Sequence, residues 1–300
     1  MYDLIIIGAG SAGLPAGMYA SRYKLHNCII GVMPGGALAT SHKVENYPGT
    51  LSATGREIMD RFTEHAVSAG SELIQDEVSS VTKSGNIFTV QTASGKTLEA
   101  KYVLLAIGNK YRRLGVPGEE KYFGAGVSYC ATCDGMFFRN RNIALVGGGN
   151  TAITEALYLA EICKEVHILV RGDEFKAETV WIDQLTKHSN IQVHFDTSVT
   201  SIEGGFGVEK LILNTGNELA VDGIFVAIGN QPETAIIDSL NPAKDVAGYV
   251  IVDARQQTNV PGLYAAGDIT TGSNKFQQTI MSAAEGCLAA HSIHEDILKS

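Results

Sequence analysis

The sequence predicts an α/β fold in which one structural unit occurs twice, the second copy being inserted into the first. Short apolar strands alternate with longer helical patterns, which is typical of a largely parallel sheet covered by helices. A strand, a glycine-rich turn and a helical stretch appear at residues 4–23 and again at residues 143–162. A further strand, at residues 263–268, follows the second copy and ends in Gly-Asp.

Length and composition limit the function classes. The 300 residues, 45% of them hydrophobic, are enough for about two domains. A net charge of −9, without runs of like charge, argues against nucleic acid or an anionic membrane surface as partner. The first apolar run, Leu4–Ile7, is too short for a signal peptide or a membrane span. We therefore expect a soluble, cytoplasmic protein.

The first glycine-rich turn has the spacing that a dinucleotide pyrophosphate requires. Gly8 permits a tight turn, Gly10 lets the backbone approach the phosphates, and Gly13 allows close helix–strand packing. The helix that begins here offers unpaired N–H groups to an anion. After the next strand, at residues 27–30, the sequence has no acidic residue for a ribose.

The second glycine-rich turn, Gly147–Ala152, is a variant of the same pattern. Its next strand, Val166–Val170, leads into Arg171 and, five residues later, Lys176. An arginine at this strand end can contact a 2′-phosphate, although both cations also fit ordinary solvated loop positions. The two turns together predict two Rossmann-like dinucleotide-binding domains.

The order in which the chain passes through the two domains follows from a second pair of similar strand segments. Val103–Gly108 resembles Phe225–Gly229, and Leu263–Asp268 is a third such strand, which we expect to return to the first domain. Its Gly-Asp end can place a carboxylate beside the ribityl or phosphate groups of a cofactor. We therefore expect a discontinuous first domain at 1–114 and 243–300, and a second domain at 115–242. We expect the chain to cross between them at Asn109–Arg113 and at Asn230–Pro232.

Five cysteines are too few, and odd in number, for a disulfide framework. The close pair Cys130 and Cys133 could bind zinc, form two inert thiols or act in redox chemistry. Zinc needs four ligands, and Cys28, Cys163 and Cys287 stand alone. Inert thiols would not account for the spacing, whereas a redox pair does. We expect a redox pair and no metal.

Asp134 directly follows this pair and has two interpretations. It forms a turn dipeptide with Gly135, and it is also placed to give and take protons near a thiolate. Two dinucleotide sites and a disulfide need an electron relay, because a nicotinamide delivers hydride and a disulfide is opened by attack on sulfur. FAD in one site and NAD(P)H in the other satisfies this requirement.

On these motifs the chain resembles the low-molecular-weight bacterial thioredoxin reductases over nearly its whole length. The segments that support the resemblance are Gly8–Gly13, Gly35–Leu38, Glu45–Gly49, Cys130–Asp134, Gly147–Ala152, Ala266–Asp268 and Gly286–Ala290. The Cys-Ala-Thr-Cys-Asp run is the most specific of them. Ferredoxin–NADP reductases of the same fold lack this run.

The resemblance implies a homodimer that binds FAD and reduces thioredoxin. It implies that Cys133 faces the flavin, that Cys130 attacks thioredoxin and that Asp134 handles protons. The candidate residues on the FAD side are Gly8, Gly10, Ser11, Ala12, Gly13, Gly35, Gly36, Ala37, Leu38, Asn46, Gly108, Gly267, Asp268, Gln277, Gln278 and Thr279. The candidate residues on the nucleotide side are Gly147, Gly149, Asn150, Thr151, Arg171 and Lys176.

The sequence departs from the family pattern at the nucleotide motif, where one arginine is kept, one becomes Gly172 and one becomes Lys176. Where the family has an arginine before Gln278, this chain has Gln277, and where the family usually has a glutamine, it has Ala37. A subgroup of similar flavoproteins takes electrons from ferredoxin instead. NADPH is the favoured donor, with NADH, or ferredoxin without any nucleotide, as alternatives. A non-catalytic FAD- and NAD-binding redox sensor is the rival from another class.

Overall fold

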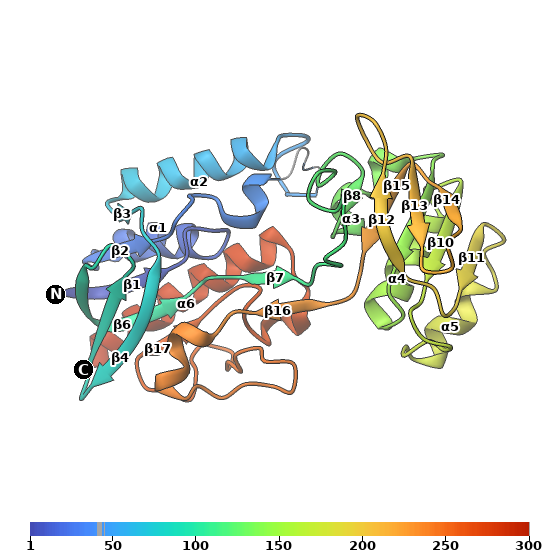
Figure 1. Ribbon diagram of the computed structural model, residues 1–300. Coiled ribbons are helices and arrows are strands. Elements are labelled where there is room, and N and C mark those ends of the chain that lie inside the picture. Colours follow the sequence, from blue (N-terminus) through green and yellow to red (C-terminus); the bar gives the residue numbers. More distant parts are fainter. Residues whose placement is uncertain (41–43, 45, 300) are drawn as a thin grey trace. The chain divides into compact units, whose positions relative to one another are not determined.

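The computed structural model describes residues 1–40, 44 and 46–299, and it divides the chain into two compact units (Figure 1). Unit 1 comprises Met1–Lys110 and Gln231–Ser300, and unit 2 comprises Tyr111–Asn230. The crossings therefore lie at 110/111 and 230/231, inside the segments expected for them, whereas the expected domain bounds at 114/115 and 242/243 lie later in the sequence. Residues after the second crossing belong to unit 1 because Ile237 is fully buried in its core and the Ser239 hydroxyl donates to the Val81 carbonyl at 2.8 Å.

Unit 1 contains one mixed sheet. Its strands are β1 (Tyr2–Ile7), β2 (Asn27–Ile30), β3 (Glu72–Ile74), β4 (Val78–Ser84), β5 (Ile87–Thr92), β6 (Thr97–Leu105) and β17 (Leu263–Ala265). Strands β3, β2, β1, β6 and β17 lie side by side and run parallel. The β4–β5 hairpin pairs antiparallel with the first half of β6. The long strand β6 thus joins the parallel part of the sheet to the hairpin.

Both faces of this sheet are buried, as a parallel sheet requires. Successive strand residues point to opposite faces, so Leu4 and Ile6 belong to one core cluster while Ile5 and Ile7 belong to another. The helices of unit 1 are α1 (Gly13–Arg22), α2 (Gly55–Ala69) and α6 (Thr279–Lys299), with 3-10 turns at Gly36–Thr40, Ala235–Leu240 and Gly272–Lys275. Helix α1 packs against both α2 and α6.

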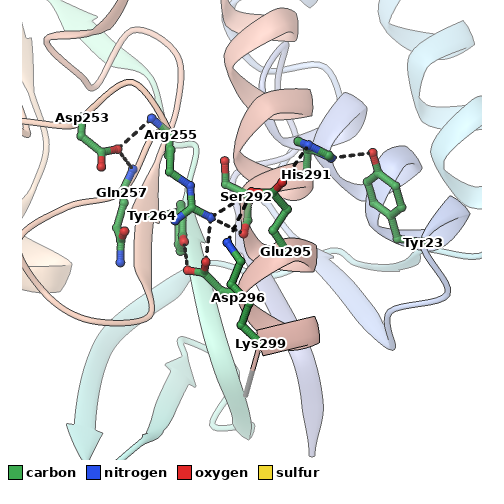
Figure 2. A network of polar contacts seen from close by, with 10 residues as sticks. All are labelled: Tyr23, Asp253, Arg255, Gln257, Tyr264, His291, Ser292, Glu295, Asp296 and Lys299. Atoms are coloured by element: carbon green, nitrogen blue, oxygen red, sulfur yellow. Dashed lines mark hydrogen bonds and ion pairs between the residues drawn. The ribbon is translucent and has the colours of Figure 1, made fainter.

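The expected return of the chain to the first unit is confirmed by β17, whose residues pair in register with Val103–Leu105 of β6. Helix α6 is fixed to β17 by a polar network, which Figure 2 shows. Asp296 accepts hydrogen bonds from the Tyr264 hydroxyl at 2.5 Å and from the Arg255 guanidinium at 2.7 Å. The network holds the helix whose start carries the candidate residues Gln278 and Thr279.

Unit 2 is a second, smaller α/β unit. Its strands are β8 (Val127–Ser128), β9 (Asn142–Val146), β10 (Glu165–Leu169), β11 (Ile191–His194), β12 (Val199–Glu203), β13 (Lys210–Leu213), β14 (Glu218–Ala220) and β15 (Gly223–Val226). Its helices are α3 (Ala131–Asp134), α4 (Asn150–Ala160) and α5 (Thr179–Leu185), with a 3-10 turn at Gly135–Phe138. Strands β11, β10, β9, β15 and β8 form a parallel sheet, and β12–β14 form a separate antiparallel one. The predicted α/β class is confirmed.

The short strands β7 (Asn109–Tyr111) and β16 (Asn230–Pro232) lie at the two crossings. Within the described part of the chain, none of the helices has the length and apolar character that crossing a membrane demands.

Candidate functional site

Cys130 and Cys133 form a disulfide, with their Cα atoms 5.3 Å apart. Cys130 caps the one-turn helix α3, and its carbonyl accepts the N–H groups of Cys133 at 3.2 Å and Asp134 at 3.1 Å. Both cysteine side chains are half-buried, so exposure alone does not distinguish their roles. Cys28 and Cys163 are buried and Cys287 is half-buried, all three as free thiols. The predicted close pair is therefore the disulfide of this chain.

Ser128 organises this redox turn. Its hydroxyl donates to the Asp134 carboxylate at 2.6 Å and accepts the Cys130 N–H at 3.1 Å. The Ser128 side chain is 3% exposed and lies at the end of β8, which pairs with β15. Asp134 is thus tied to the backbone of Cys130 and is more than a turn residue.

A second carboxyl group reaches the turn from helix α4. Burial raises the pKa of Glu155 to about 7, although a hydrogen bond from the backbone of Ala131 lowers it in part. The helix packs closely against the segment after the disulfide, since a Cβ atom at Gly135 would lie 3.0 Å from Leu159. Met136 and Phe137, which follow, are 43% and 45% exposed. Apolar surface therefore adjoins the disulfide.

The first glycine turn has the geometry that its spacing predicts. Gly8 has φ +115°, and a Cβ atom at Gly13 would lie 1.8 Å from the Gly8 carbonyl oxygen. A Cβ atom at Gly10 would meet only Gly36, at 3.9 Å, so the backbone there stays open to a bound group. Helix α1, all of whose residues are described, has no side-chain cap and no acidic residue in its first turn. These features fit a dinucleotide phosphate.

The candidate FAD-side residues far apart in the sequence come together in unit 1. The Gly35 N–H donates to the Ala9 carbonyl at 2.7 Å, which places the Gly35–Leu38 segment beside the first glycine turn. Asn46 donates to the Gln278 side chain at 3.1 Å, and Gln277 donates to the Asp268 carbonyl at 3.3 Å. Glu45, which belongs to the same sequence segment as Asn46, lies outside the described residues.

Asp268 lines a pocket together with Gln277, Met281 and other residues of the same segment. Burial raises the pKa of the Asp268 carboxyl, while the hydrogen bond that Ser282 donates at 3.0 Å lowers it in part. Nearby, Glu285 is 6% exposed and accepts the Gly267 N–H at 2.7 Å. Polar, partly buried side chains therefore lie among the residues expected on the FAD side.

The second glycine turn is built like the first. A Cβ atom at Gly147, which has φ +152°, would lie 2.4 Å from the Ala227 carbonyl oxygen, whereas a Cβ atom at Gly149 would have nothing within 4 Å. Helix α4, fully described, also begins without a side-chain cap. The Asn150 side chain instead accepts the Glu178 N–H at 2.7 Å.

The candidate 2′-phosphate residues lie beside this turn. The Lys176 N–H donates to the Gly148 carbonyl at 2.7 Å, and the side chains of Arg171 and Lys176 are exposed. Asp173 and Glu174 are exposed on the same loop. The structure therefore brings both cations to the second glycine turn, in company with two acidic residues.

The remaining candidate residues lie in or next to the helices, turns and strands of their units. Ser11 contacts Met59, Ala12 is buried, Ala37 and Leu38 lie in the 3-10 turn, Gly108 follows β6, Thr151 is exposed on α4 and Thr279 begins α6. Ser128, Glu155, Ser282 and Glu285 were not predicted. They belong to a strand and two helices, and no motif marks them. The cysteine pair and the first glycine turn lie in different units.

Comparison with known proteins places these features in a family. Residues 2–286 match the family described as pyridine nucleotide-disulphide oxidoreductase. The chain is 38% identical over 306 residues to the thioredoxin reductase of Helicobacter pylori, covering 98% of each protein. It is 40% identical over 298 residues to the bifunctional thioredoxin reductase/thioredoxin of Mycobacterium leprae, covering 97% of this chain but only 64% of that longer protein.

Solved structures agree. The chain matches the crystal structure of thioredoxin reductase from Streptococcus pyogenes with a TM-score of 0.92 at 34% identity, covering 100% of this chain and 99% of the other. The chain therefore belongs to the pyridine nucleotide-disulphide oxidoreductase family, among its thioredoxin reductases.

Proposed function

We propose that this protein reduces the disulfide of thioredoxin or a thioredoxin-like protein, with electrons passing from a donor through FAD to Cys130 and Cys133. The observation that carries the proposal is the half-buried disulfide between these cysteines at the start of α3. The relatives named thioredoxin reductase support thioredoxin as the partner. Asp134, hydrogen-bonded into the same turn, is the proposed proton-handling group.

The exchange follows from the reduced cysteine pair. The Cys130 thiolate bonds to one partner sulfur and breaks the partner disulfide. Cys133 then gives up its proton, bonds to the Cys130 sulfur and releases the second partner thiolate. The cysteine pair loses two electrons and two protons and becomes a disulfide, and the partner disulfide gains both and becomes a dithiol. The assignment of Cys130 as the attacking sulfur rests on the family resemblance.

The FAD site proposed here comprises the first glycine turn together with Asn46, Asp268, Gln277 and Gln278. When bound, FAD would supply a two-electron relay between the donor and the disulfide. The open backbone at Gly10 and the uncapped start of α1 fit its pyrophosphate. The half-buried carboxyl of Asp268, whose pKa burial raises, fits hydrogen bonding to the ribityl hydroxyls of FAD.

We propose NADPH as the donor, bound at the second glycine turn with Arg171 and Lys176 toward the 2′-phosphate. The loss of one arginine to Gly172 removes a charge-assisted contact that is worth about 1.5–3 kcal/mol. We therefore expect weak NADPH binding and little discrimination against NADH. Ferredoxin docking on Lys110, Arg112 and Arg113 has less support, since Lys110 is paired with Glu233 at 2.7 Å.

The deciding experiment is anaerobic mixing of the oxidised, FAD-loaded protein with NADPH, NADH and reduced ferredoxin in separate runs. Rapid flavin bleaching by NADPH supports the proposal, and bleaching by ferredoxin alone overturns the choice of donor. Thioredoxin is then added to the reduced protein. Reoxidation of the flavin band with formation of thioredoxin thiols is expected for a reductase. A flavin that stays reduced with several thioredoxins would favour the redox-sensor alternative.

We also propose that the protein is a homodimer, as the resemblance implies. Sedimentation equilibrium of the FAD-loaded protein should give twice the chain mass. A single chain mass over the accessible concentration range would refute this part of the proposal.

A further inference from the structure

The side chain of Ser128 is held rigidly beside the disulfide. It is 3% exposed, and its residue ends strand β8, where it pairs with Phe225 of β15. Only Tyr129 separates it from Cys130. Because the sheet fixes its backbone and the surrounding side chains exclude water, its hydroxyl has few alternative partners.

The hydroxyl links two groups of the redox turn. It lies 2.6 Å from a carboxylate oxygen of Asp134, accepts the Cys130 N–H at 3.1 Å and lies 3.4 Å from the Cys130 carbonyl. A hydroxyl carries one proton, and the Asp134 carboxylate, which is charged and closer, is a stronger acceptor than the Cys130 carbonyl. The hydrogen-bond chain therefore runs from the Cys130 N–H to Ser128 and on to Asp134.

This chain couples the backbone of one cysteine to the carboxyl group that follows the other. Asp134 also donates its own N–H to the Cys130 carbonyl at 3.1 Å, so hydrogen bonds hold both its backbone and its carboxyl group. Removing the Ser128 hydroxyl would leave the Cys130 N–H without this acceptor and the carboxylate without this donor. The carboxylate would then be freer to rotate.

We propose that Ser128 is a positioning residue of the disulfide exchange, holding the Asp134 carboxyl where it takes the proton of Cys133. The inference rests on the proposed function. In that exchange Cys133 must lose its proton before its sulfur bonds to Cys130, and the released partner thiolates take up the protons. Ser128 touches no reacting sulfur in this scheme and acts only through Asp134.

The test is a double-mutant cycle with Ser128→Ala and Asp134→Asn in the FAD-loaded protein. Ser128→Ala should slow thioredoxin reduction by roughly tenfold or more, and Asp134→Asn by roughly 10²- to 10⁴-fold, the range for lost acid–base catalysis. In the Asp134→Asn protein, Ser128→Ala should have no further effect. Equal slowing by Ser128→Ala in both backgrounds would overturn the proposal.

A second readout does not depend on turnover. The rate at which iodoacetamide alkylates the reduced pair is measured against pH. Ser128→Ala should move this profile, whereas Ser292→Ala, which removes a hydroxyl that is 2% exposed in unit 1, should leave it unchanged. An unmoved Ser128→Ala profile would contradict the inference, even if the wild-type protein proves not to reduce thioredoxin and the proposed function fails.

Ser128→Thr guards against misfolding of the alanine variant. It keeps the hydroxyl in a strand, where threonine is favoured. It should retain the wild-type pH profile of both reactions. A folded threonine variant with the alanine behaviour would show that the hydroxyl is not the active feature.

Discussion

Glu155 in α4 is expected to make unit 2 less stable as the pH rises. Burial raises the pKa of its carboxyl from 4.5 to about 7, so the folded protein keeps a proton that the unfolded chain has already lost. A tenfold change in an acid equilibrium corresponds to about 1.4 kcal/mol. Stability is therefore lost from about pH 4.5 upward, and the loss is complete, at about 3 kcal/mol, above the folded pKa.

The change Glu155→Gln removes this charge and keeps an acceptor for the Ala131 N–H. Relative to wild type, the free energy of unfolding of the variant should rise by about 2–3 kcal/mol between about pH 5 and about pH 8.5. Urea unfolding is followed by the fluorescence of Trp181, the single tryptophan of the chain, which lies on α5 in the same unit.

Glu161→Gln is the matched control, because Glu161 ends the same helix and is exposed. Its difference from wild type should stay nearly constant with pH. If Glu155→Gln also shows a constant difference, the carboxyl is ionised in the folded protein at pH 5, and the argument from burial is wrong.

Three further changes test other parts of the structure. Cys133→Ser should trap a mixed disulfide between Cys130 and thioredoxin on a non-reducing gel, and Cys130→Ser should not; the reverse pattern would exchange their roles. Gly13→Ala should destabilise unit 1 by about 3 kcal/mol and lower its FAD content, because its Cβ would clash with Gly8; a wild-type melting curve would contradict the close approach. Burial alone would raise the pKa of Asp296, but hydrogen bonds from Tyr264 and Arg255 lower it overall. Asp296→Asn should therefore destabilise the protein near neutral pH, and progressively less as the pH falls through the folded pKa. Thermal melts at several pH values measure this, and a pH-independent loss would count against the network in Figure 2.

The local signals in the sequence were the reliable ones. The apolar runs, the two glycine turns and the strand at 263–265 each follow from short patterns, and the structure places all of them in the expected α/β units. The crossing segment at 230–232 was predicted, but the second domain bound was placed at 242, because the contacts of Ile237 with the core of unit 1 join residues far apart in the sequence. No short pattern encodes such contacts.

The residues of the candidate site likewise divide into those with a local sequence signal and those that depend on contacts far apart in the sequence. Cys130 and Cys133 could be predicted because their spacing suffices for a disulfide. Ser128 and Glu155 could not, since a serine in a strand and a glutamate in a helix are each unremarkable until the fold brings them to α3. The pairing of Lys110 with Glu233 likewise appears only once the strands at the crossing are in place.

The return of the chain to β17 also decides the order in which the units can fold during synthesis. The second half of strand β6, Val103–Leu105, has no partner on one side until residues 263–265 have been made, whereas all strands of unit 2 lie between residues 111 and 230. Unit 2 can therefore fold first, while the parts of β1 and β6 that later pack against Ile237, Val250 and Ala289 stay uncovered. Unit 1 is therefore the part of the nascent chain that stays incompletely folded longest.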